Sequence, residues 1–273
     1  MTTPLAAAPT FDLERVLASI DRMSAQRPVA AQIVSVANSD EASAKELSRI
    51  LSADLALASR VMKLSNSAFY GMRGRVSSLQ FAVTVVGFTT VRTMATVALT
   101  DLDDESRLPP SFWDVSTSLA LAASTVAPRF GQRAQDALCL GLLAQLGVAL
   151  LFHNDPEGYT DLWTDLPTST GRRLAEVHRY GISALRLTAV ALEQWGFPVS
   201  MVQPLKEVDD LQSTDGALLR AAFEITHRLT VADHEDVPMA ELTLGRLLDR
   251  DVLPILEQVR VEAGELRQAL LED

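Results

Sequence analysis

Four histidines, one cysteine and several acidic runs are the side chains that could move protons, attack a substrate or hold a metal ion in this 273-residue chain. His153 is expected at a helix end before a turn, His178 in a polar helix and His234 in a solvated acidic turn. Neither these three nor His227 belongs to an HExxH or HxH motif, the spacings that bring two imidazoles to one ion. The spacing therefore predicts no metal site.

The other candidates for catalysis are equally sparse. Cys139 is the only cysteine and has no polar activating neighbour in sequence, so we expect a buried thiol that packs as a small apolar side chain. The acidic runs 103–105 and 209–210 lack the apolar surroundings that shift a carboxyl pKa. The sequence also contains no GxSxG, Walker A or dinucleotide-binding motif. Nothing here indicates a hydrolase or an NTPase.

The composition, with 48% hydrophobic and 22% charged residues, is typical of a helix-rich globular protein. A single cysteine excludes an intramolecular disulfide and fits the reducing cytoplasm. The N-terminus lacks the basic and apolar regions of a signal peptide. The longest uncharged apolar run, 137–152, is shorter than the ~20 residues of a bilayer span. We expect a cytoplasmic protein without membrane insertion.

The net charge of −11 is unevenly distributed. Residues 1–100 contain 10 Lys and Arg against 7 Asp and Glu, which leaves 14 against 28 in residues 101–273. Because a phosphate backbone is held mainly by basic side chains, the acidic C-terminal part argues against general nucleic-acid binding.

A basic loop at 66–75, NSAFYGMRGR, is the least ordinary segment. Its Asn and Ser can shape a turn, and Gly71 and Gly74 permit a positive φ. Backbone and basic side chains here could receive a phosphate or carboxylate, for example from a cyclic dinucleotide. Alternatively, the loop is a structural connection whose charges face water. The cations in question are Arg60, Lys63, Arg73 and Arg75.

The sequence pattern predicts that these residues lie on or between helices. Apolar residues recur every three or four positions in segments that begin with polar caps, including Ser43 of a capping box with Glu46, Asp54, and Ser77 or Ser78. The β-branched run 81–88 keeps this spacing and is expected to be helical, and Thr89-Thr90 is expected to cap the next helix. The predicted helices cover 11–27, 29–37, 43–51, 54–64, 79–88, 89–98, 112–127, 136–152, 183–195, 218–229 and 252–271.

The run ELSRILSADLALASRVMKLSNSAFYG, followed by SSLQFAVTVVGFTTVRTMA, resembles the HDOD domain, the HD-related output domain of bacterial signalling proteins. Two departures are Leu55 in place of the family's proline and Val86 in place of its leucine. The resemblance extends from about residue 11 to about 210. Its landmarks are Asp54, Asn66, Ser67, Ala82, Gly87, Phe112, Trp113, Ser116, Gly141, Gly147, Glu176, Gly181, Trp195, Gly196, Phe197 and Pro198.

The resemblance implies an all-α, bilobed, multi-helix fold with an HD-like C-terminal lobe. The expected HDOD domain covers 11–210 and follows a disordered tail at 1–10. Its N-terminal lobe covers 11–100, the acidic, proline-containing linker covers 101–111, and the HD-like lobe covers 112–210. The helices of 211–273 are expected to pack on the HD-like lobe.

The resemblance also indicates where a metal site would be. In catalytic HD hydrolases, a histidine and an aspartate that bind metal stand at the positions of Ala144 and Gln145. Other positions where relatives often have histidine are Val115, Ala184, Val208 and Asp209. One carboxylate cannot hold a catalytic divalent ion alone. We therefore expect no cofactor and a packed interior.

Two details of that interior follow. Gly141 and Gly147 are expected to allow close helix packing, and Gln145 to bond a neighbouring backbone group. The function implied is a catalytically inactive signalling adaptor that docks signalling or regulatory proteins. Binding of a small anionic signal such as a cyclic dinucleotide and a residual metal-dependent phosphohydrolase activity remain as alternatives.

Overall fold

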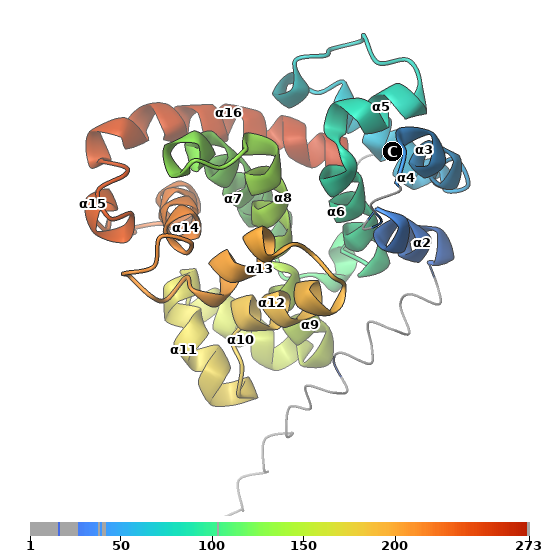
Figure 1. Ribbon diagram of the computed structural model, residues 1–273. Coiled ribbons are helices and arrows are strands. Elements are labelled where there is room, and N and C mark those ends of the chain that lie inside the picture. Colours follow the sequence, from blue (N-terminus) through green and yellow to red (C-terminus); the bar gives the residue numbers. More distant parts are fainter. Residues whose placement is uncertain (1–15, 17–26, 38, 40–41, 103, 272–273) are drawn as a thin grey trace, which may run out of the picture.

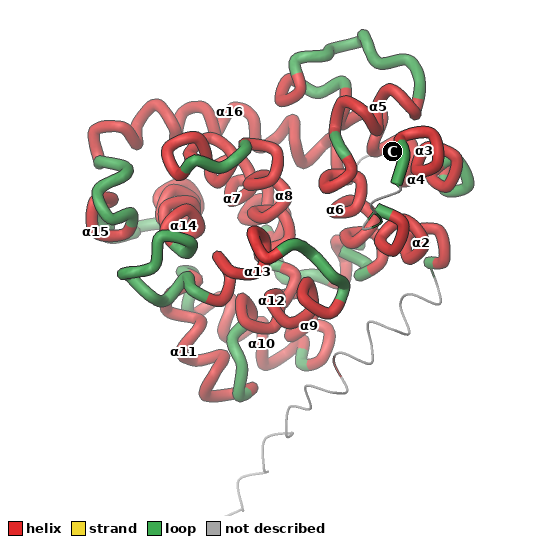
Figure 2. The backbone as a smooth tube through the Cα atoms, viewed as in Figure 1, coloured by secondary structure: helices red, strands yellow, loops and turns green. Residues whose placement is uncertain are grey.

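The computed structural model describes residues 16, 27–37, 39, 42–102 and 104–271. The expected tail 1–10 and, apart from Val16 and Arg27, the expected helix 11–27 lie outside these residues. All regular elements of the described part are helical (Figure 2). The prediction of an all-α fold is confirmed.

The N-terminal helices lie together on one side of the molecule (Figure 1). They are α2 (Pro28–Val36), α3 (Ala44–Leu51), α4 (Leu55–Ser65), the 3-10 helix η1 (Ala68–Tyr70), α5 (Leu79–Val86) and α6 (Phe88–Leu99). The predicted caps start them: the Ser43 hydroxyl accepts the Glu46 N–H at 3.1 Å, and the Asp54 carboxylate accepts the Leu57 N–H at 3.0 Å. Side chains thus satisfy backbone donors that a helix start leaves unpaired.

The β-branched run is helical, as predicted, and the Ser78 hydroxyl accepts the Phe81 N–H at 3.3 Å. The predicted cap at Thr89-Thr90 is wrong. Gly87, with φ 80°, ends α5 and precedes the first residue of α6 directly. A positive φ turns the chain sharply without a polar cap.

The remaining helices form the larger part of the fold. They are η2 (Glu105–Arg107), α7 (Phe112–Val126), η3 (Ala127–Phe130), α8 (Ala134–Ala144), α9 (Leu146–Asn154), α10 (Pro156–Asp165), α11 (Ser169–Tyr180), α12 (Ala184–Gln194), α13 (Val199–Lys206), α14 (Ala217–Thr230), α15 (Met239–Leu242), η4 (Asp249–Asp251) and α16 (Val252–Leu271). The single helix expected at 136–152 is two helices, because the chain breaks at Gln145.

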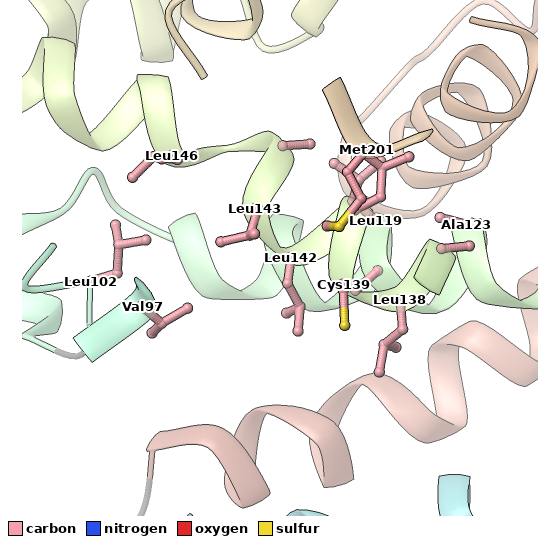
Figure 3. Packing of buried hydrophobic residues seen from close by; sticks show 14 of the residues in the cluster. Val97, Leu102, Leu119, Ala123, Leu138, Cys139, Leu142, Leu143, Leu146 and Met201 are labelled. Atoms are coloured by element: carbon pink, nitrogen blue, oxygen red, sulfur yellow. The ribbon is translucent and has the colours of Figure 1, made fainter. Parts of the chain in front are cut away.

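Helices α7 and α8 form the centre of the core. Figure 3 shows Leu138, Cys139 and Leu142 of α8 beside Leu119 of α7 and near Met201 of α13. The Cys139 thiol is fully buried, and burial raises its pKa to about 11. The prediction of a buried, apolar thiol is confirmed.

Helix α16 packs along α7 and also reaches α4, so it spans both halves of the chain (Figure 1). Ion pairs add to these contacts: Glu265 lies 3.4 Å from Arg73 of the basic loop that follows α4, and Arg267 lies 3.6 Å from Asp114 of α7. The C-terminal helix therefore touches α4 of the N-terminal helices as well as α7 and α14.

One helical stretch among the described residues, Ala134–Asn154, is long and apolar enough to cross a membrane. The bent pair of α5 and α6 passes the same criterion only if both are taken as one span. In this fold, 83% of the apolar window of Ala134–Asn154 is buried inside the protein, as expected of a core helix.

Candidate functional site

Three of the six positions that the resemblance aligns with HD metal ligands, Ala144, Gln145 and Ala184, lie at the junction of α8, α9 and α12. Ala144 and Ala184 are 0% and 3% exposed. A Cβ added to Gly147 would lie 1.9 Å from the Ala184 carbonyl oxygen, so the two backbones are in direct contact. The Thr188 hydroxyl accepts the Gly147 N–H at 2.8 Å and lies 3.2 Å from the Ala144 carbonyl oxygen. The Gly147 N–H thus donates to the Thr188 side chain at the break between α8 and α9.

The other aligned positions supply almost no ligands. Val208 is buried, and Val115 is half-buried on α7. Asp209, the only carboxylate among the six positions, lies 2.7 Å from the Arg173 guanidinium and is 66% exposed. Asp209 therefore forms a surface ion pair with Arg173. These residues do not fit the divalent metal of an HD hydrolase, which needs several protein ligands around one point.

Gly141 and Gly147 allow close helix packing, as predicted. A Cβ on Gly141 would lie 2.5 Å from the Ala120 Cα, so α7 and α8 pack backbone to backbone. The expectation for Gln145 is wrong: its buried side-chain nitrogen has no hydrogen-bond partner among the described residues. The surrounding side chains are apolar, and the neighbouring Ala144 carbonyl accepts a hydrogen bond from the Thr188 hydroxyl instead.

A buried carboxylate holds the start of α12 in place. Glu176 is 2% exposed and accepts the Tyr159 hydroxyl at 2.5 Å and the Ala184 N–H at 2.8 Å. Burial, followed by the charge of Glu176, raises the pKa of Tyr159 well above its usual value. The family landmark Glu176 thus caps the helix that presses against Gly147.

Two further landmarks stabilise loops. The Asn66 side chain donates to the Val76 carbonyl at 2.9 Å and accepts the Val76 N–H at 3.1 Å, which closes the basic loop. The Trp113 indole donates to the Leu102 carbonyl at 2.9 Å. The sequence marks these residues as landmarks, but their partners become visible only in the folded chain.

A third landmark joins the two halves of the chain. The Trp195 carbonyl accepts a hydrogen bond from Arg92 of α6, and the Arg92 guanidinium lies 3.6 Å from the centre of the Phe197 ring. Arg92 is only 4% exposed, so this contact is part of the interior. Pro198 then precedes α13 as its N-cap.

The histidines are only partly where the sequence predicts them. His153 lies in the last turn of α9, and His178 is exposed on α11, both as predicted. The prediction of a solvated His234 is wrong. Its side chain is 10% exposed, and its Nε2 atom lies 3.1 Å from both oxygens of the buried Glu224.

Glu224, His227 and His234 have ligand atoms within 4.8 Å of one another, an arrangement that the sequence spacing did not reveal. However, His227 Nε2 accepts the Ser169 N–H at 3.0 Å, and a neutral imidazole has only one lone pair. Glu224 also accepts the Arg228 guanidinium at 2.8 Å. A cation would have to displace these bonds. The cluster is better described as a polar clamp between α14 and the loop that follows it.

The basic loop adopts the expected turn, since Gly71 and Gly74 have φ of 64° and 68°. A cavity of about 600 Å³ beside it is lined by Lys63 and Arg73, together with Glu265 of α16. Neither Arg60 nor Arg75 lines that cavity. The fold therefore does not bring the four cations to one cavity. Only Lys63 and Arg73 line it, together with the carboxylate of Glu265.

The fold is an all-helical domain in which four of the six positions aligned with HD metal ligands, Val115, Ala144, Ala184 and Val208, are apolar. The HDOD domain model matches residues 23–211, and the chain belongs to the HDOD domain family. A comparison with curated proteins gave no significant match.

Solved structures share this fold. A protein of Shewanella amazonensis SB2B named as a candidate phosphohydrolase has a TM-score of 0.66 and 21% identity, over 93% of this chain and 96% of that one. A candidate signal transduction protein of Marinobacter aquaeolei VT8 has a TM-score of 0.68 and 21% identity, over 89% and 58%. An HDOD protein of Geobacter sulfurreducens with unknown function has a TM-score of 0.60 and 18% identity, over 95% and 98%. At these identities the likeness shows the fold alone.

Proposed function

We propose that this chain is a catalytically inactive signalling adaptor that acts through protein contacts. Membership of the HDOD family supports the signalling role. The observation that carries the proposal is the contact between Gly147 and Ala184. Ala144 and Ala184 have no ligand atoms in their side chains, and their helices touch where an HD hydrolase would hold its metal. A protein built in this way transmits a signal by binding.

The proposal predicts capture of a specific partner without metal. The tagged full-length protein, expressed in the cells from which the sequence comes, should retain at least one protein in buffer with a chelator. Protein contacts that involve no divalent ion do not weaken when the ion is removed. Retained proteins are identified by mass spectrometry and compared with those held by the tag alone. A protein that retains no partner under any condition would contradict the adaptor function.

A further inference from the structure

A cleft of about 710 Å³ lies where the linker between the two halves meets α7 and α16. Residues far apart in sequence line it, including Glu105 of the linker, Asp114 and Ser118 of α7, and Gly264 and Arg267 of α16. The cleft is separate from the positions of the HD metal ligands, none of which lines it.

The cleft is negatively charged. Asp104, Glu105 and Asp114 contribute three carboxylates to its lining and Arg267 contributes one guanidinium, so the lining has a net charge of −2. Arg267 lies 2.5 Å from Glu105 and 3.6 Å from Asp114, whereas Asp104 has no ion-pair partner among the described residues. A hydrogen bond from the Ser106 hydroxyl lowers the pKa of Asp104 and keeps it ionised. Such a cleft attracts a cation.

A buried hydroxyl in the lining is also available to a ligand. Ser118 is 7% exposed and lines the cleft, yet its side chain forms no hydrogen bond to any residue that the structure describes. The neighbouring Thr117 hydroxyl, in contrast, donates to the Trp113 carbonyl at 2.8 Å. Because this hydroxyl lines the cleft and has no partner among the described residues, it can accept a hydrogen bond from a ligand that supplies a donor.

Gly264 keeps space open in the wall. It lies inside α16, where glycine is a poor helix former, and a Cβ added to it would meet no atom within 4 Å. Packing therefore does not require a glycine at this position. Apolar atoms of Ala263 and Leu271 line the same wall. This wall suits the methylene chain of a ligand whose cationic end reaches the carboxylates.

We propose that this cleft receives a lysine side chain of the partner protein, an inference that rests on the proposed adaptor function. The ammonium group offers three hydrogen-bond donors, which match the carboxylates and the Ser118 hydroxyl. The four-carbon stem covers the apolar wall. A lysine suits the cleft better than a planar guanidinium, because Arg267 already bridges Glu105 and Asp114.

The test uses NMR titration of the full-length, ¹⁵N-labelled protein with a short peptide that contains one lysine. We expect the amide signals of Ser118 and Gly264 to shift with the peptide and to stay unchanged with the same peptide carrying acetyl-lysine. Gly264→Leu should fill the cleft and weaken binding by about tenfold or more, while the protein melts at the same or a higher temperature. The melting temperature excludes misfolding as the cause.

Charge variants distinguish a specific site from a generally acidic surface. Asp114→Asn should weaken peptide binding by about two- to fivefold, the usual effect of one exposed ion pair. Glu257→Gln is the control, because Glu257 is an exposed carboxylate of α16, which also forms a wall of the cleft, but Glu257 itself does not line the cleft. Equal effects of the two variants would overturn the proposal. Binding of spermidine with no binding of the peptide would also overturn it in favour of a free polyamine.

Binding of the captured partner to wild type and to the Gly264→Leu variant tests the cleft inference separately from the proposed adaptor function. If the partner binds wild-type protein and the Gly264→Leu variant equally well, the cleft inference is wrong and the adaptor function stands. If no partner is captured at all, the adaptor function fails, whereas binding of the lysine peptide still reports on the cleft itself.

Discussion

The Gly147→Ala protein is expected to lose about 3 kcal/mol or more of unfolding free energy, because the new methyl group would lie 1.9 Å from the Ala184 carbonyl oxygen. A backbone atom cannot rotate away as a side chain can, so α9 and α12 must separate. That movement also breaks the bond between the Gly147 N–H and Thr188. Urea unfolding followed by circular dichroism measures the change.

Gly264→Ala is the matched control for this prediction. It is also a glycine-to-alanine change within a helix, but the new Cβ meets open space. Alanine should raise the unfolding free energy by about 0.5–1 kcal/mol through helix propensity. Similar unfolding free energies for the two variants would show that α9 and α12 are not in backbone contact.

The second large effect is expected in acid and involves His227. Burial, then the nearby charges of His234, Arg172 and Arg173, lowers the pKa of His227 from 6.5 to about 3. In the unfolded chain the ring binds a proton below about pH 6.5, while in the folded chain it stays neutral down to about pH 3. The unfolded state is therefore favoured as the pH falls through this window. Between pH 6.5 and 4.5 the loss should reach about 2–3 kcal/mol.

The comparison of wild type with His227→Gln isolates this effect. Glutamine can still accept the Ser169 N–H but does not titrate, so the variant should lose about 2–3 kcal/mol less than wild type between pH 6.5 and 4.5. His178→Gln, at an exposed position, should follow the wild-type pH dependence. The same pH dependence in wild type and His227→Gln would contradict a neutral, buried imidazole.

Much of the helical framework could be predicted from the sequence, because its signals are local. Ser43, Asp54 and Ser78 cap helices within three residues of themselves, and the apolar spacing of 81–88 identified a helix despite its β-branched residues. The break at Gln145 could not be predicted in this way. It depends on Thr188, which lies 41 residues from Gly147 in sequence.

The candidate site could be predicted in part. The apolar types at Ala144 and Ala184 are evident once the family landmarks are aligned, whereas their contact requires the fold. Similarly, the polar run around His234 looked solvated because nothing nearby in sequence identifies Glu224 as its buried partner. The acidic cleft joins Glu105 to Arg267 across 162 positions and has no sequence signal.

Metal content, measured together with phosphoester hydrolysis, tests directly whether the protein lacks a hydrolytic metal site. The purified protein is incubated with excess Mn²⁺, desalted, and analysed for metal by mass spectrometry and for hydrolysis of a chromogenic phosphodiester. We expect well under one ion per chain and hydrolysis no faster than in buffer. One tightly held ion per chain, with turnover that a chelator abolishes, would contradict it.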